Sequence, residues 1–173
     1  MKRAIRFALE SDAEAVAGIY APYVNETAIT FENTPPDASL MRSRIREISK
    51  NFPYLVLEEE CGVTGYAYAH AYKPREAYSP TVELSVYVDK DKLGAGRGKM
   101  LTEALIEILK NDARRYTAIA NITSPNEKSE RMFLSLGFKK VSEFRNVGFK
   151  FGRWQTVCDY ILPLKAYDEY PKA

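Results

Sequence analysis

The sequence has 173 residues, of which 46% are hydrophobic and 28% are charged, and its net charge at pH 7 is +2. A chain of this length suits one domain with a full core and leaves almost no residues for a second, so we expect a single domain over residues 1–173. The nearly neutral balance excludes a general case for nucleic-acid binding, which needs a large basic excess, although a basic cluster can still serve one small polyanion.

Few side chains of the kinds that bind metals are present. Cys61 and Cys158 are two isolated thiols, which make neither a disulfide framework nor a metal site. Because His70 is the single histidine, zinc sites and Ser-His-Asp triads are nearly excluded. The start of the chain, Met1–Arg6, has no long apolar run after its charges, and no stretch approaches the length of a membrane span. We therefore expect a reduced, cytoplasmic protein with no metal and no nucleic-acid or membrane partner.

The first predicted elements are a short strand at Ile5–Phe7 and two helices. Ser11 and Glu14 have the spacing of a capping box at the start of the first helix. Its apolar residues recur at helical spacing: Val16, Ile19, Tyr20, Tyr23 and Val24. A loop at Pro35–Asp37 precedes the second helix, which ends before Pro53. One face of that helix carries Met41, Ile45 and Ile48.

The middle of the chain is predicted to be rich in strands. Tyr54–Leu57 and Val63–Tyr72 form a pair joined by a tight turn at Glu60–Gly62. Lys73–Pro80 is a loop, and Thr81–Val88 is the next strand. A glycine- and lysine-rich loop then leads into a helix, whose apolar residues are Met100, Leu101, Ala104, Leu105, Ile108 and Leu109.

The last third of the chain is predicted to contain three strands and one helix. Tyr116–Ile122 is predicted to be a strand, and Ser124–Asn126 opens a helix that ends at a glycine cap, Gly137. That helix carries Met132, Phe133 and Leu136. Two further strands, Phe138–Val147 and Trp154–Leu162, are joined by a turn at residues 150–153. The order β, α, α, then strands, then β-α-β-α-β-β indicates one α/β domain with a largely antiparallel sheet.

The most informative stretch follows the strand at residues 81–88 and reads Leu93-Gly94-Ala95-Gly96-Arg97-Gly98-Lys99. Glycines let backbone N–H groups approach an anion without Cβ clashes, and the N-terminus of a helix adds unpaired N–H donors and a positive dipole. Lys92, Arg97 and Lys99 add positive charge. The pattern predicts a cradle for a pyrophosphate group.

Other interpretations of this loop compete with the cradle. A dinucleotide-binding fold has its glycines directly after the first strand, whereas these lie in the middle of the chain. A P-loop needs Ser or Thr after its lysine and a glycine where this chain has Leu93; Met100 follows the lysine, so that interpretation fails. A flexible loop between strand and helix remains the structural alternative.

The segment Ser85–Leu101 resembles motif A of the GNAT superfamily of N-acetyltransferases, in which a strand is followed by Gln/Arg-x-x-Gly-x-Gly/Ala. Both key glycines of the motif are present, whereas Leu93 replaces the usual polar first residue. The resemblance implies acetyl-CoA as cosubstrate, with its pyrophosphate bound by Gly94, Ala95, Gly96, Arg97, Gly98 and Lys99. It also implies that main-chain groups of Val86, Tyr87 and Val88 contact the pantetheine and the thioester carbonyl.

Two downstream stretches, Asn126–Ser129 and Leu134–Phe138, resemble the N-x-x-S and LGF stretches of the same superfamily. The resemblance implies that Asn126, Ser129 and Ser135 contact the CoA arm, while Asn126 is also suited to cap the helix. Phe133 stands where many members place a tyrosine as general acid. We therefore expect no side-chain acid at this position.

Three longer stretches resemble the phosphinothricin N-acetyltransferase family, which also includes acetyltransferases of methionine sulfoximine and methionine sulfone. They are residues 19–32, 78–88 and 148–154. The resemblance implies a single-domain GNAT fold, with a mixed, mostly antiparallel sheet flanked by helices and split by a V-shaped opening for acetyl-CoA. It further implies a homodimer and a small-molecule amine substrate, namely the α-amine of an amino-acid analogue such as phosphinothricin.

Acetyl transfer needs an unprotonated amine, and a nearby carboxylate can take its proton. Glu83 matches the family's catalytic glutamate, against the alternative of a strand glutamate that faces solvent. Substrate contacts are implied for Phe31, Glu32, Lys73, Arg75, Glu76 and Tyr78. Of these, Arg75 is suited to grip a carboxylate, or else it is a solvated loop residue.

Three further residues are not expected to act in catalysis. Phe151 replaces a histidine of some family members, and Trp154 and His70 are interpreted as packing residues. Two other functions stay open: acetylation of a different amine, such as an antibiotic or a peptide N-terminus, and non-catalytic sensing of acyl-CoA.

Overall fold

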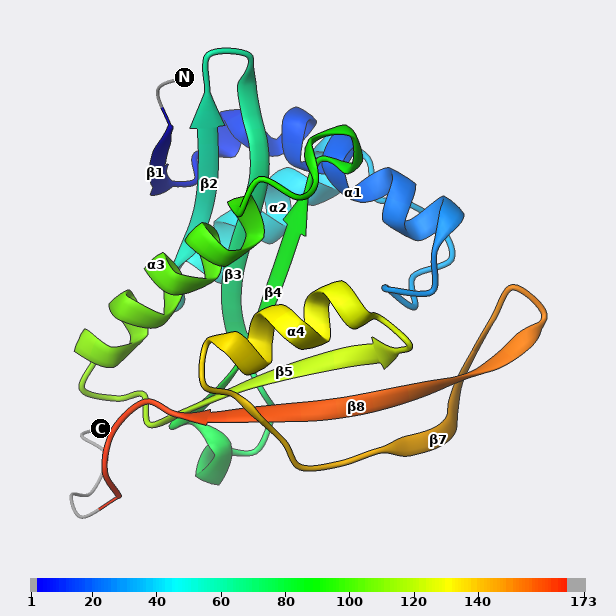
Figure 1. Ribbon diagram of the computed structural model, residues 1–173. Helices are drawn as coiled ribbons and strands as arrows, with labels where there is room; N and C mark the ends of the chain where they lie inside the picture. Colours follow the sequence, from blue (N-terminus) through cyan, green and yellow to red (C-terminus); the bar gives the residue numbers. More distant parts are fainter. Residues whose placement is uncertain (1–2, 168–173) are drawn as a thin grey trace. The chain divides into compact units, whose positions relative to one another are not determined.

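The computed structural model describes residues 3–167 and has eight strands and four α-helices in that range (Figure 1). The chain divides into two compact units. The first contains residues 3–27, 32–69 and 85–105, and the second contains residues 28–31, 70–84 and 106–167. Strand β4 (Thr81–Val88) and helix α3 (Arg97–Asn111) contribute residues to both units.

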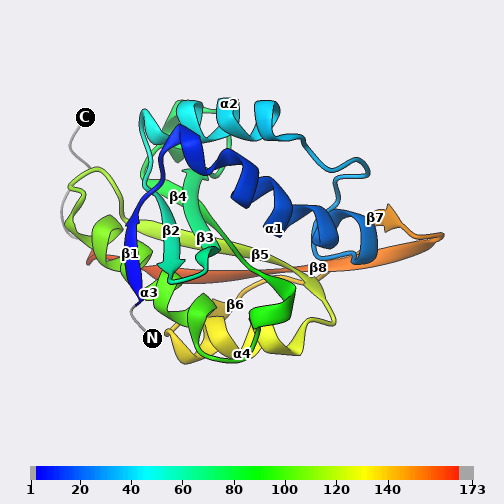
Figure 2. The same cartoon turned by 90° about the horizontal axis from the view of Figure 1, so that it is seen from above.

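In the first unit, β1 (Ala4–Phe7), β2 (Tyr54–Glu59) and β3 (Gly62–Ala71) pair antiparallel in that order. Helices α1 (Ala13–Glu26) and α2 (Ala38–Ser49) cover one face of these strands, and the first turns of α3 lie on the other face (Figure 2). Gly65 allows a close approach here: a Cβ at this position would lie 3.0 Å from Leu101 of α3 and 3.1 Å from the carbonyl oxygen of Tyr87, so these neighbours would have to shift by a few tenths of an ångström.

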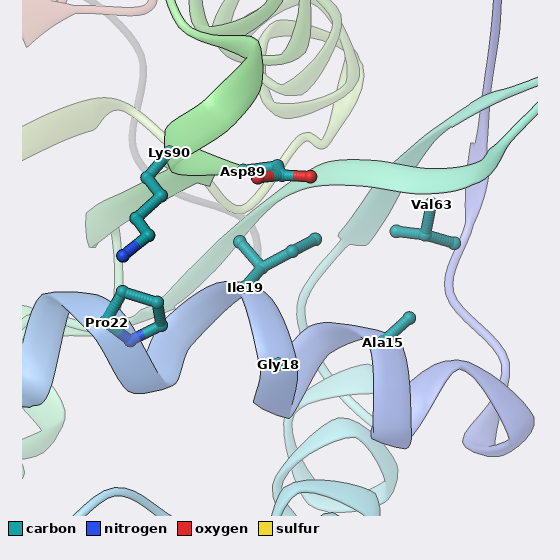
Figure 3. Close-up of a pocket in the computed structure, with 7 residues that line it drawn as sticks. All are labelled: Ala15, Gly18, Ile19, Pro22, Val63, Asp89 and Lys90. Carbon is teal, nitrogen blue, oxygen red and sulfur yellow. The ribbon is translucent and has the colours of Figure 1, made fainter.

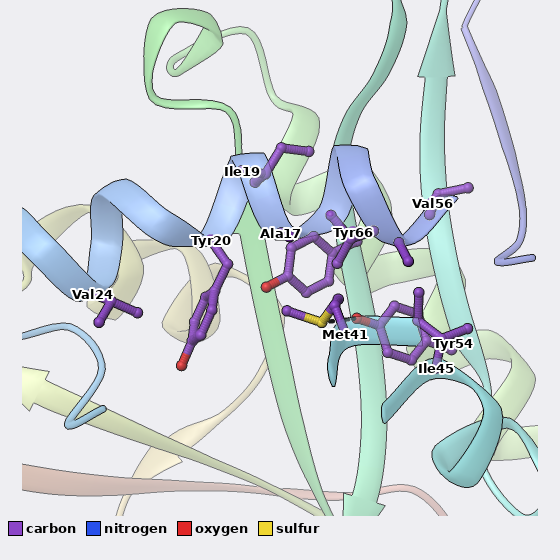
Figure 4. Packing of buried hydrophobic residues seen from close by; sticks show 11 residues of the cluster. Ala17, Ile19, Tyr20, Val24, Met41, Ile45, Tyr54, Val56 and Tyr66 are labelled. Atoms are coloured by element: carbon purple, nitrogen blue, oxygen red, sulfur yellow. Dashed lines mark hydrogen bonds between the residues drawn. The ribbon is translucent and has the colours of Figure 1, made fainter. Parts of the chain in front are cut away.

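The core of the first unit lies between α1, α2 and the strands (Figure 4). Tyrosine rings fill it: Tyr54 stacks on Tyr68 with ring centroids 4.9 Å apart and on Tyr66 at 5.8 Å. Each such pair contributes about 0.5–1.5 kcal/mol beyond the burial of its area. The remaining buried members of this cluster are Ala13, Val16, Ala17, Ile19, Tyr20, Val24, Met41, Ile45 and Val56.

In the second unit, the first residues of β4 pair parallel with β5 (Thr117–Ser124), beginning at Thr81↔Thr117. Strand β8 (Arg153–Pro163) pairs antiparallel with β5 along one edge. Along its other edge it pairs antiparallel with β6 (Lys139–Lys140) and β7 (Phe144–Lys150). Helix α4 (Glu127–Ser135) follows β5. The predicted α/β class with a mixed, mostly antiparallel sheet is therefore confirmed.

The hairpin of β7 and β8 turns through two residues with positive φ, Phe151 at 52° and Gly152 at 71°. Two such residues in succession give the type I′ turn that matches the twist of paired strands. The continuous strand predicted over Phe138–Val147 is wrong, because residues 141–143 separate β6 from β7. There the hydroxyl of Ser142 accepts a hydrogen bond from the backbone N–H of Asp159 at 3.0 Å, in place of a ladder carbonyl.

The predicted capping box is also wrong. Ser11 lies inside a short 3₁₀ turn, Glu10–Asp12, and α1 begins after it. The carboxylate of Asp12 accepts the backbone N–H of Leu9 at 2.8 Å and pairs with Arg6 at 2.8 Å, so Asp12 performs the capping. None of the helices between residues 3 and 167 is both long and apolar enough to span a membrane.

Candidate active site

Strand β4 carries the predicted base. Side chains alternate along a strand, so Glu83, Ser85 and Tyr87 share one face of β4. The Glu83 side chain is 23% exposed. Burial, and secondarily the negative charge of Asp159, raise the pKa of Glu83 to about 7. Near neutral pH this carboxyl group is therefore divided between its two protonation states, as a group that takes and releases protons must be.

A histidine lies beside this carboxyl group. The Nε2 atom of His70, at the end of β3, is 3.7 Å from an Oε atom of Glu83. Its Nδ1 lies 3.0 Å from the carbonyl oxygen of Ala71, which can only accept, so Nδ1 carries the proton in the neutral ring. Burial lowers the pKa of His70 and keeps it neutral at pH 7. His70 thus contacts the candidate base, in contrast to the packing role inferred from sequence.

The glycine loop leaves space at its two positions of positive φ. Gly94 has φ +92° and Gly96 has φ +76°, and nothing lies within 4 Å of a Cβ built at either. Other residues rarely adopt this conformation, which explains the glycines. Helix α3 starts directly afterwards at Arg97, and the first N–H groups of an α-helix have no partner within it. The loop therefore presents donors beside an open surface.

The three basic side chains of the loop differ in their surroundings. Arg97 donates to Glu59 at 3.0 Å and to the carbonyl oxygen of Lys92 at 2.8 Å. The ammonium of Lys92 is 2.6 Å from the sulfur of Cys61. Lys99 is 47% exposed and lies 3.9 Å from Glu103 across one helical turn. Of these three, Lys99 faces solvent most openly.

The end of β4 is held by the first unit. The hydroxyl of Tyr23 donates to the carbonyl oxygen of Val88 at 2.6 Å, and the N–H of Asp89 donates to the carbonyl oxygen of Thr64 at 2.9 Å. The ring of Tyr87 contacts those of Tyr20, Tyr23 and Tyr66 at centroid distances of 4.9–5.3 Å. These contacts fix the strand end, and they occupy the carbonyl of Val88.

Helix α4 places its three predicted contact residues at its two ends. The side chain of Asn126 accepts the N–H of Ser129 at 3.4 Å, which is the capping arrangement. Ser135, in the last turn, donates its hydroxyl to the carbonyl oxygen of Met132 at 2.8 Å. Phe133 is buried and its ring meets that of Phe138 edge-on at 5.0 Å. The position expected to lack an acid is thus occupied by a core side chain.

The loop before β4 forms a polar surface. Lys73 places its ammonium 4.7 Å from the ring centroid of Tyr72 and 5.1 Å from that of Tyr78. The two rings meet edge-on at 5.8 Å, so this lysine is held by cation–π contacts. Arg75 and Glu76 are exposed at the start of a short 3₁₀ turn, Glu76–Tyr78.

The predicted pocket residues Phe31 and Glu32 have different partners. Phe31 lies over Gly148 of β7, where a Cβ would approach its ring to 2.2 Å. Lys150, two residues further along β7, is buried and donates to the carbonyl oxygen of Thr30 at 2.8 Å. The carboxylate of Glu32 is held by both terminal nitrogens of Arg44, at 2.7 and 2.9 Å. Glu32 is thus neutralised by a structural partner.

Trp154 is 63% exposed and contacts Phe149 edge-on at 5.2 Å, so most of this side chain does not pack in the core. A pocket of about 210 Å³ lies between α1 and the residues after β4 (Figure 3). Its lining consists of Ala15, Gly18, Ile19, Pro22, Val63, Asp89 and Lys90. No predicted site residue is among them, so this pocket is separate from the candidate site.

Residues 5–156 match the family model described as an acetyltransferase (GNAT) domain. The match spans most of the chain, and the chain therefore belongs to the GNAT acetyltransferase family. The phosphinothricin N-acetyltransferase of Alcaligenes faecalis is 38% identical over 166 residues, which cover 95% of this chain and 84% of that relative. The L-methionine sulfoximine/L-methionine sulfone acetyltransferase of Salmonella typhimurium is 37% identical and covers 87% of this chain and 88% of its own.

A solved structure supports the same family assignment. The GNAT superfamily phosphinothricin acetyltransferase from Sinorhizobium meliloti, in complex with AcCoA, has a TM-score of 0.94 at 32% identity, over 99% of this chain and 94% of its own. The resemblance predicted from motifs is thus confirmed, and so are the GNAT fold and the acetyltransferase class.

Proposed function

We propose that the protein transfers the acetyl group of acetyl-CoA to the α-amine of a small amino-acid analogue such as phosphinothricin, methionine sulfoximine or methionine sulfone. The observation that carries this proposal is Glu83, a largely buried carboxyl group with a pKa of about 7 on the strand that resembles motif A. The names of the relatives supply the class of acceptor.

Glu83 acts as the general base. An α-amine is largely protonated at neutral pH, and the ionised form of Glu83 accepts one of its protons. A positively charged neighbour would lower the pKa of this base, but burial keeps His70 neutral. Acetyl-CoA supplies an activated acyl group: the amine nitrogen bonds to its carbonyl carbon, and the carbon–sulfur bond breaks to release CoA.

The glycine loop fits the pyrophosphate of acetyl-CoA. It combines open space beside Gly94 and Gly96, the free N–H groups at the start of α3, and the exposed ammonium of Lys99. A side chain at either glycine would fill the cradle. We assign pyrophosphate binding to residues 94–99, with Lys99 as the charged side chain, because the guanidinium of Arg97 is already bound by Glu59 and by the carbonyl oxygen of Lys92.

The loop before β4 binds the acceptor. Arg75 is exposed there, and a guanidinium binds a carboxylate through two parallel hydrogen bonds. An amino acid gripped in this way presents its α-amine to the base. Amines without a carboxylate lose this contact, so the proposal excludes them as good acceptors.

The experiment is a free-thiol assay of CoA release with four acceptors: phosphinothricin, methionine sulfoximine, an aminoglycoside and a short peptide. Activity with the first two supports the proposal. Activity confined to the aminoglycoside or the peptide would contradict the acceptor class while leaving the acetyltransferase class intact. Binding of acetyl-CoA without turnover of any acceptor would favour an acyl-CoA sensor.

We further propose that the protein is a cytoplasmic homodimer. The hairpin of β7 and β8 exposes a set of large apolar side chains, each more than half exposed: Phe144, Val147, Phe149, Phe151 and Trp154. Two of them, Phe149 and Trp154, are in contact, and monomers rarely leave a large apolar patch uncovered. Light scattering at micromolar concentration tests the dimer, with Phe149→Ser/Trp154→Ser as the variant expected to shift the protein toward monomer. Cell fractionation tests the compartment.

A further inference from the structure

A buried carboxylate lies under the glycine loop. Glu59, the last residue of β2, has a side chain that is only 3% exposed. Its two oxygens are held by separate arginines: Arg3 Nε donates to one at 2.8 Å, and Arg97 Nε and Nη2 lie 3.0 Å from the other. Burial opposes ionisation, but the hydrogen bonds from Arg97, Arg3 and Thr64 outweigh it and lower the pKa of Glu59. The carboxylate is therefore charged throughout the neutral range.

Each arginine also binds the backbone of the loop. Arg97 Nη1 donates to the carbonyl oxygen of Lys92 at 2.8 Å, and Arg3 Nη1 donates to the carbonyl oxygen of Ala95 at 3.2 Å. These two carbonyls lie on either side of Gly94. Glu59 thus orients two guanidinium groups, and the guanidinium groups orient the loop.

The direction of these two carbonyl groups sets the direction of the N–H groups that follow them in the chain. In a planar trans peptide, the C=O of one residue and the N–H of the next point in opposite directions. With the carbonyls of Lys92 and Ala95 turned toward the arginines, the N–H groups of Leu93 and Gly96 point away from them. This is the orientation that an anion-binding loop requires.

We propose that Glu59, Arg3 and Arg97 are positioning residues that hold the loop with its N–H groups turned toward the pyrophosphate. The proposal rests on the proposed function and deepens it. It also changes the role of Arg97, which resemblance had placed among the direct contacts. The Arg97 side chain is 10% exposed and satisfied by Glu59 and Lys92, so it acts on the loop and not on the phosphate.

The test compares two neighbouring glutamates. Glu59→Gln removes the charge that orients both arginines. Glu58→Gln is the matched control, since Glu58 pairs with Arg6 at 2.8 Å, and Arg6 binds Asp12 and the carbonyl oxygen of Phe7 and not a residue of the loop. We expect Glu59→Gln to raise the Kd for acetyl-CoA by about tenfold to a hundredfold, the size of a lost charged hydrogen bond, and Glu58→Gln to leave it unchanged. The KM for the acceptor should stay near the wild-type value in both variants.

Non-additivity separates positioning from direct binding. If Arg97 acts through the loop, Arg97→Gln and Glu59→Gln remove parts of one network, and the double variant binds acetyl-CoA no more weakly than the worse single variant. If Arg97 contacts phosphate directly, Glu59→Gln frees it and affinity is kept or improved, which would overturn the proposal.

Hydrogen exchange of the protein without ligand tests the positioning role separately from the proposed acetyltransferase function. The amide of Met100, which donates to the carbonyl oxygen of Gly96 at 2.9 Å, should exchange at least about tenfold faster in Glu59→Gln than in the wild type and the Glu58→Gln control, because the loop loses its anchors. If the wild type bound no acetyl-CoA, the proposed function would fail while this readout still tested the network. Unchanged exchange in Glu59→Gln would refute the positioning role. Should that variant not fold, Arg3→Lys, which keeps the charge but not the fork of donors, is measured in the same way.

Discussion

Replacing Glu83 by glutamine should make the protein less active and, above neutral pH, more stable. Glutamine keeps the shape of the side chain but cannot accept a proton. General base catalysis contributes about 10²–10⁴-fold, so turnover of phosphinothricin should fall within that range while the affinity for acetyl-CoA stays similar. In the wild type, turnover should rise with pH through a midpoint near 7, because only the ionised form of Glu83 accepts the proton.

The gain in stability follows from the same pKa. The rise from 4.5 to about 7 means that ionising Glu83 in the folded protein is disfavoured by about 3 kcal/mol relative to the unfolded chain. Between these two values the folded state binds more protons than the unfolded state, so the stability of the wild type falls as pH rises through this window. Glu83→Gln does not ionise and escapes that loss.

Urea denaturation at pH 5 and pH 8 measures the effect. The free energy of unfolding of Glu83→Gln, relative to the wild type, should increase by up to about 3 kcal/mol from pH 5 to pH 8. Glu60→Gln is the control for the loss of one carboxyl group, because Glu60 lies exposed in the turn between β2 and β3. A stability difference that is independent of pH, or near-normal turnover in Glu83→Gln, would refute the reasoning.

Three further predictions concern the surroundings of Glu83 and the acceptor. Asp159→Asn removes a negative charge that raises the pKa of Glu83, so the acidic limb of the pH–rate profile should move to lower pH; an unmoved limb would mean that burial alone sets this pKa. Gly148→Ala places a methyl group against the Phe31 ring and forces the ring to move, because overpacking at this site would destabilise the fold by about 1–3 kcal/mol if the ring kept its position. Steady-state kinetics should then show a higher KM for the acceptor, while the affinity for acetyl-CoA stays unchanged. Arg75→Ala should raise the KM for phosphinothricin by about ten- to a hundredfold, as for a lost charged hydrogen bond, with Arg75→Lys intermediate; equal KM values in all three proteins would make Arg75 a solvated loop residue.

Elements defined by local chemistry were predictable from the sequence. The strand over Thr81–Val88 has the predicted bounds, because alternating apolar residues end at a loop of lysines and glycines. The cap at Asn126 and the glycine after α4 also follow local rules: Asn126 accepts an N–H of the first turn, and Gly137 has φ +91°.

Elements that depend on distant partners were not predictable. A capping box at Ser11 and a cap at Asp12 are both allowed locally, and the choice is decided by Arg6, which lies on β1 and pairs with Asp12. Likewise, nothing in residues 138–147 predicts a break in the strand. The break depends on Ser142 meeting the backbone of Asp159, which lies 17 residues further along the chain.

In the candidate site, too, the sequence predicts residues of local motifs but misses contacts between distant residues. Sequence resemblance predicts Glu83 and the glycine loop as site residues, because both lie in contiguous motifs. It did not find His70 beside Glu83 or Glu59 beneath Arg97, since the second pair is separated by 38 residues and meets only in the folded chain. For both pairs a signal was nevertheless present: an ionisable residue stood near the end of a strand made mostly of core side chains, where an unpaired charge would be disfavoured.

Glu59 and Glu83 show how tertiary neighbours set the pKa of a buried carboxyl group. Glu59 and Glu83 are both largely buried, yet the pKa of Glu59 is lowered and that of Glu83 is raised. The difference lies in their neighbours: two arginines face Glu59, whereas a neutral histidine and the carboxylate of Asp159 lie near Glu83. A glutamate held ionised by arginines is suited to fix a backbone, and one left without cations is suited to exchange protons. In our two proposals the same residue type therefore serves as anchor at the end of β2 and as base on β4, and the tertiary neighbours decide which.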